Sequence, residues 1–139
     1  MAGVIKMKRI LFVLLIMNCS VSWAEWELFG EDTERKTIWY IEKSSVQREG
    51  VISKMWHMTN FLSTRKSKDG KPYKSEKVFY GYDCKTKRSN IYKAVRYSQL
   101  DGKGSVVDSL DFEVLGEKWE PIVPGAFDAE LWKIACGKK

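Results

Sequence analysis

The sequence predicts an α+β protein: a single antiparallel β-sheet of about six strands, packed against one C-terminal α-helix and fastened by one disulfide. Three observations predict this class. Short runs rich in aromatic and β-branched residues, separated by turn residues, recur from Trp26 to Phe112, as in strands. The connections between these runs are short, which favours antiparallel pairing. The apolar residues then change to a helical period near the end of the chain.

Six strands are expected in chain order. Turn residues separate them: Glu49 and Gly50 precede the third strand, and Asp101 and Gly102 precede the sixth. The charged stretch 63–75, with its Asp-Gly pair and proline, is expected to form a hairpin loop. The strands are expected at residues 25–30, 36–42, 50–62, 76–84, 89–100 and 105–113.

One helix is expected from about Phe127 to Cys136. Phe127, Leu131 and Ile134 recur at helical spacing. The charges suit the helix dipole, because acidic residues lie near the start and a basic residue near the end: Asp128, Glu130 and Lys133. A helix of ~10 residues is marginal alone in water, so packing against the sheet must hold it.

Residues 1–24 have the pattern of a cleavable signal peptide, which leaves a single domain at 25–139. Basic residues precede an apolar run at 10–17, and Ser22 and Ala24 supply the small residues before the cleavage site. The run is shorter than the ~20 residues that cross a bilayer as a helix. Lipid attachment at Cys19 is the less favoured alternative, because Asn18 precedes it. Translation could start at Met1 or Met7.

Loss of the signal leaves two cysteines, Cys84 and Cys136. In an oxidising compartment they most simply form one disulfide. Closing a loop of about 53 residues contributes on the order of 4 kcal/mol in the chain-entropy model. Because strand side chains alternate, Val78, Tyr80 and Tyr82 should share the side of Cys84 and lie under the helix. Trp119 and Trp132 are expected to pack on the helix side.

Large apolar groups are expected on both faces of the sheet. Met55 alternates with Trp56, and Phe79 with Tyr80. One short helix covers one face only, so either the sheet curls on itself or a partner covers the other face. A homodimer through the uncovered face is one such arrangement.

Charge and side-chain chemistry argue against two function classes. The formal net charge falls from +6 to +3 when Lys6, Lys8 and Arg9 leave with the signal, which gives little support to nucleic-acid binding. His57 is the only histidine, and with both remaining cysteines in a bridge no nucleophile and base pair can be assembled. No enzyme activity and no cofactor are therefore expected.

Two segments have a functional interpretation beside a structural one. The basic loop could bind sulfated glycans, lipid head groups or acidic proteins, or it is a solvated hairpin tip, which is the commoner case; its residues are Arg65, Lys66, Lys68, Lys71 and Lys74. In "MWHM", Met55 and His57 are weak candidates for a copper(I) site. Met58 would point to the opposite face, and methionine beside aromatic residues more often fills a core.

The order of several motifs resembles the surface-adhesin protein E family. These motifs are "TIWYIEKSSV", "VISKMWHM", "YGYDC" followed by "KTKR", "WEPIVPG" and "LWKIAC". The resemblance implies an antiparallel sheet with a C-terminal helix. In the best-known member it also implies a sheet-mediated dimer on an outer-membrane lipid anchor, which binds host proteins such as vitronectin and laminin. The chain departs from this pattern at Asn18, which disfavours a lipid anchor, and at Ala126, where a serine often caps the helix.

The sequence thus predicts an exported, non-catalytic binding domain from a Gram-negative type of cell. It is expected in the periplasm, secreted, or at the cell surface, with host matrix proteins as partners by resemblance. A periplasmic copper-binding protein and a structural protein of the envelope are the alternatives.

Overall fold

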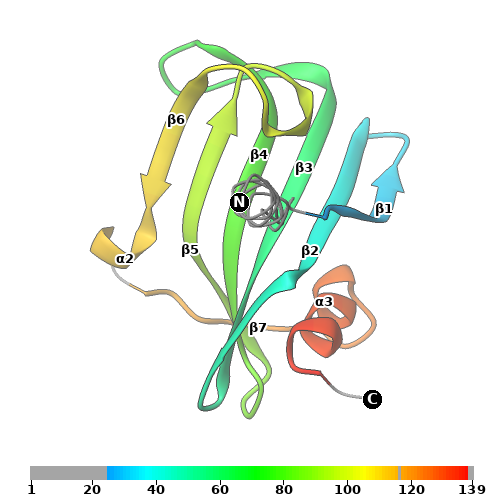
Figure 1. Ribbon diagram of the computed structural model, residues 1–139, viewed down its shortest axis with the longest axis vertical. Helices are drawn as coiled ribbons and strands as arrows, with labels where there is room; N and C mark the ends of the chain where they lie inside the picture. The colour runs from blue at the N-terminus through cyan, green and yellow to red at the C-terminus, as the bar shows by residue number, and fades with distance from the viewer. Residues whose placement is uncertain (1–24, 116, 138–139) are drawn as a thin grey trace, which may run out of the picture.

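The computed structural model describes residues 25–115 and 117–137, and its architecture confirms the predicted class (Figure 1). Six strands pair in chain order in one antiparallel sheet, and a short seventh strand pairs with β5. The expected signal peptide at 1–24 lies outside the described residues. The elements are β1 (Glu27–Asp32), β2 (Thr37–Glu49), β3 (Ile52–Lys66), β4 (Pro72–Asp83), β5 (Arg88–Tyr97), the 3-10 turn η1 (Leu100–Gly102), β6 (Val106–Asp111), α2 (Phe112–Leu115), β7 (Glu120–Pro121) and α3 (Phe127–Ala135).

The hairpin between β3 and β4 is shorter than the expected loop at 63–75. β3 continues to Lys66 and β4 begins at Pro72, with Arg65 paired to Tyr73 across the ladder. The prediction was wrong because a charged strand with solvated side chains carries no alternating apolar signal, although its backbone still pairs. Gly70 closes the remaining turn at φ 76°, a left-handed angle that glycine adopts at little cost.

The ends of two other strands also differ from the expectation. β2 runs seven residues past Glu42, with an irregular register between Glu42 and Gln47. β6 ends at Asp111, because residues 112–115 form the short helix α2. β7 has no clear pattern in the sequence and forms by pairing with β5. α2 follows Asp111, whose side chain accepts a hydrogen bond from the backbone amide of Glu113 at 3.0 Å.

Helix α3 lies beneath β1 and beside the lower half of β2 in Figure 1, and it matches the predicted helix to within one residue. Its end is tied to the sheet by the disulfide Cys84–Cys136, with an S–S distance of 2.08 Å. The indole nitrogen of Trp132 donates to the carbonyl of Asp83 at 2.9 Å, and Arg48 donates to the carbonyl of Cys136 at 3.1 Å. No helix in the described part of the chain is long and apolar enough to cross a membrane.

The core lies between α3 and the middle strands. Leu131 and Trp132 pack there with Ile41, Met55 and Tyr82, which is 1% exposed. Tyr80 packs against this cluster, as expected of the residues that share the side of Cys84. The sheet side under α3 is therefore the one predicted from strand alternation.

The first turn of α3 packs differently from the expectation. Phe127 lies against Phe29 and Trp39, with ring centroids 4.7 Å and 4.8 Å away, and is 42% exposed. It therefore rests on β1 and β2 rather than on the tyrosines of β4.

The opposite face of the sheet has its own aromatic cluster. Trp56 and Phe79 stack with centroids 4.8 Å apart. The ring of Tyr92 covers Gly81 so closely that an added Cβ would displace it. Trp119 packs edge-on against Tyr92. Its expected place on the helix side was wrong, because the segment before β7 crosses the other face.

Candidate functional site

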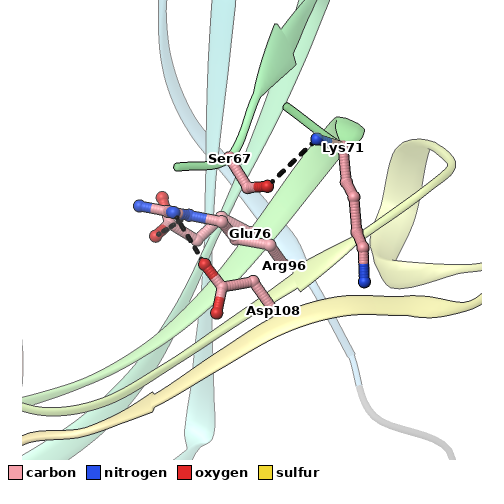
Figure 2. A network of polar contacts seen from close by, with 5 residues as sticks. All are labelled: Ser67, Lys71, Glu76, Arg96 and Asp108. Carbon is pink, nitrogen blue, oxygen red and sulfur yellow. Dashed lines mark hydrogen bonds and ion pairs between the residues drawn. The ribbon is translucent and has the colours of Figure 1, made fainter. Parts of the chain in front are cut away.

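The predicted basic segment forms a compact hairpin tip, here called the basic hairpin (residues 65–74). Ser67 organises its turn: the backbone amide of Lys71 donates to the Ser67 hydroxyl at 3.2 Å (Figure 2). The backbone amide of Gly70 donates to the Ser67 carbonyl at 3.0 Å. All five cationic side chains are exposed, and none forms an ion pair within the described residues. They are Arg65, Lys66, Lys68, Lys71 and Lys74.

A three-residue charge network lies at the base of the basic hairpin (Figure 2). Arg96 lies between two carboxylates, with Nη1 3.1 Å from Asp108 and Nε 3.4 Å from Glu76. Burial raises the pKa of Glu76, and the guanidinium of Arg96 opposes that rise. Arg96 is thus the ion-pair partner of both carboxylates, and neither of them forms an ion pair with a cation of the basic hairpin.

Sequence reasoning missed this network. Glu76, Arg96 and Asp108 lie on three strands and meet only because the register pairs Glu76 with Arg96 and Arg96 with Asp108. No spacing along the chain indicates such a cross-strand contact.

A second basic segment follows β4 at the other end of the sheet. Lys85 and Lys87 lie in the turn between β4 and β5, and Arg88 begins β5, whereas the basic hairpin joins β3 to β4 (Figure 1). The two segments therefore form separate patches, as antiparallel order predicts.

The candidate metal ligands Met55 and His57 lie on one face of β3, and both are buried. His57 Nε2 lies 3.0 Å from the hydroxyl of Tyr82, and its ring stacks on Tyr80 at 4.5 Å. Burial lowers the pKa of His57 to about 3, so the ring is neutral at physiological pH. Among residues 25–115 and 117–137, no group of three or more His, Cys, Asp or Glu side chains lies close enough together to hold a metal ion.

A cavity of about 390 Å³ opens between the sheet and the start of α3. Its size is within the range of small-molecule sites. Sequence reasoning missed it, because its aromatic residues were expected in the core and they meet only through the packing of α3 on the sheet. Side chains from β2, β3, β4 and α3 line it, chief among them Trp39, His57, Glu76, Tyr80, Phe127 and Asp128.

Comparisons with known proteins agree with this fold. A family model described as surface-adhesin protein E matches residues 26–137. A search of curated proteins found no match.

Solved structures of Haemophilus influenzae protein E resemble the chain at low identity. One has a TM-score of 0.60 at 12% identity and covers 85% of this chain and 87% of its own. A crystal structure from a non-typeable strain has a TM-score of 0.58 at 12% identity, covering 86% and 79%. At this identity the likeness establishes the shared fold.

Proposed function

The chain belongs to the surface-adhesin protein E family, and from this premise we propose that it binds a protein partner without catalysis, through the basic hairpin. The family is one of surface adhesins, which implies an exported or cell-surface location. The proposed partner is an acidic surface on a host matrix protein.

The five exposed cations of the basic hairpin are the observation that carries this proposal. No acid among the described residues forms an ion pair with them, and Glu76 and Asp108 at the hairpin base are paired with Arg96 instead. An unpaired positive cluster attracts acidic partners over several ångströms and accelerates their association. The tip also projects from one end of the sheet, where a large partner can reach it (Figure 1).

The sequence also suggested a homodimer, which we include in the proposal, and copper binding, which we do not. A second copy of the chain would pack on the face opposite α3, where Trp56 and Phe79 are only half-buried. The copper alternative has no supporting observation, since Met55 is fully buried and the Nε2 atom of His57 faces the Tyr82 hydroxyl.

Binding to immobilised vitronectin and laminin tests the proposal. We expect saturable binding at physiological salt that weakens as salt rises. Replacing four hairpin lysines with glutamine should weaken it roughly tenfold, because each exposed ion pair contributes about 0.2–1 kcal/mol. The variant is Lys66→Gln, Lys68→Gln, Lys71→Gln and Lys74→Gln.

The matched control removes four exposed lysines from elsewhere, so that the net charge changes equally. It is Lys43→Gln, Lys85→Gln, Lys93→Gln and Lys118→Gln, and it should bind like the unmodified protein. Equal losses in both variants would mean that net charge alone governs binding. An absence of binding to every matrix protein would leave the structural envelope role.

A further inference from the structure

The cavity beside α3 has two aromatic walls. Trp39 and Phe127 form one wall, with their ring centroids 4.8 Å apart. His57 and Tyr80 form the other, stacked at 4.5 Å, and Tyr82 continues that stack. Faces of such rings carry partial negative charge, which attracts cations.

The charged groups of the cavity are mainly acidic. Glu76 and Asp128 line it; Glu76 is paired with Arg96, whereas Asp128 forms no ion pair within the described chain. Arg35 is the one basic residue in the lining; its side chain is 79% exposed, and its Nε lies 3.8 Å from Asp32. An anion in the cavity would therefore be repelled by Asp128, and the one basic residue of the lining, Arg35, lies at the solvent side.

Burial and the nearby carboxylates shift the pKa values of Tyr80 and Tyr82. Burial raises the pKa of Tyr80, and the negative charges of Glu76 and Asp128 raise it further. Burial likewise raises the pKa of Tyr82, with a further contribution from Asp128. The wall rings are therefore uncharged at physiological pH, and carboxylates supply the net negative field.

We propose that this cavity binds a small organic cation of the quaternary ammonium class, held between the aromatic walls and balanced by the carboxylate of Asp128. Quaternary ammonium ions lose little hydration on entering such a site, and rings of Trp and Tyr are their usual protein partners. The volume of about 390 Å³ accommodates a trimethylammonium group with a short chain. This activity goes beyond the proposed matrix binding and is independent of the basic hairpin.

Calorimetric titration with choline tests the proposal, with 3,3-dimethylbutan-1-ol as the matched probe. The two molecules have the same shape, but the alcohol has a carbon in place of the charged nitrogen. We expect choline to bind about tenfold more tightly, because only choline gains the cation–π and carboxylate attractions. Equal affinity would show an apolar pocket and overturn the proposal, as would an absence of saturable binding by choline.

Two substitutions on α3 provide a matched pair. Asp128→Asn should weaken choline binding severalfold while leaving the alcohol unaffected. Glu130→Gln changes the charge of the same helix at a residue that is paired with Lys133 and lies outside the cavity, and it should leave binding unchanged. Equal behaviour of the two variants would contradict the site.

A variant in the wall and a lipid arm complete the test. Trp39→Leu should reduce choline binding roughly tenfold with little effect on the alcohol. Phosphatidylcholine vesicles carry the same headgroup on a membrane; vesicle binding without any response to free choline would place recognition at the bilayer surface and overturn the cavity site. The four-lysine hairpin variant should still bind choline. Such binding would show that the cavity site does not depend on whether the hairpin binds matrix proteins.

Discussion

At the scale of single residues, His57 and Tyr82 show how polar groups are kept in the core beside the cavity. The Tyr82 hydroxyl lies 3.0 Å from His57 Nε2, and both residues are buried. Burial lowers the pKa of His57 to about 3 and raises that of Tyr82. The contact is therefore a hydrogen bond between neutral groups, which satisfies both without a buried charge.

This burial predicts that acid destabilises the protein through His57. The unfolded chain binds a proton at His57 below about pH 6.5, whereas the folded chain does so only near pH 3. The stabilising contribution is thus complete above pH 6.5 and is lost as the pH falls from 6.5 toward 3. Between pH 7 and pH 5 we expect His57 to lower the free energy of unfolding by about 2 kcal/mol.

Urea unfolding of the unmodified protein and of His57→Gln at the two pH values measures this contribution. Glutamine can still hydrogen-bond to Tyr82 but does not titrate, and His57 is the only histidine. The loss between pH 7 and pH 5 should therefore be about 2 kcal/mol smaller in the variant. If the free energy of unfolding fell by the same amount in both proteins, His57 would not be buried in its neutral form.

At the scale of elements, α3 begins without a side-chain cap. Its N-cap residue Ala126 has an extended backbone (φ −80°, ψ 168°) but no side-chain acceptor for the first free amides. Serine at this position would accept a hydrogen bond from the second or third residue of the helix. The negative charge of Asp128 in the first turn interacts favourably with the helix dipole, but it does not replace the hydrogen bond of a capping side chain.

Ala126→Ser should raise the free energy of unfolding by about 1 kcal/mol, because the added hydroxyl satisfies a free amide. Chemical denaturation followed by circular dichroism measures it. Ala126→Val adds bulk without an acceptor and should give no gain. A loss of stability in Ala126→Ser would mean that the start of α3 does not hold the N-cap conformation.

The same elements show what the sequence can predict. α3 was found because Phe127, Leu131 and Ile134 repeat at helical spacing, and the central strands because their apolar residues stand between turn signals. The solvated ends of β3 and β4 lack such a signal. The charge network around Arg96 depends on strand register, and the cavity beside Phe127 depends on where α3 packs on the sheet. Both are properties of tertiary packing.

At the scale of the whole molecule, the proposed sites lie in different regions. The basic hairpin lies at one end of the sheet, the disulfide joins α3 to the sheet near the other end, and the cavity opens between α3 and the sheet (Figure 1). Only the cavity has a wall from α3. A change that loosens α3 should therefore affect the cavity and spare the hairpin, which depends on β3 and β4.

The double substitution Cys84→Ala and Cys136→Ala provides this change. The bridge joins residues 52 positions apart, so its removal should lower the free energy of unfolding by about 4 kcal/mol. Hydrogen exchange should quicken first in α3, because the bridge is the covalent link between this nine-residue helix and the sheet, and a helix of this length is marginal without tertiary support. Chemical denaturation measures the first effect, and backbone exchange by mass spectrometry measures the second. The unmodified protein under reducing conditions provides a second route to the same state.

If α3 and the central strands stayed equally protected in both states, packing alone would hold the helix. If choline binding fell while matrix binding persisted, the two sites would be structurally independent.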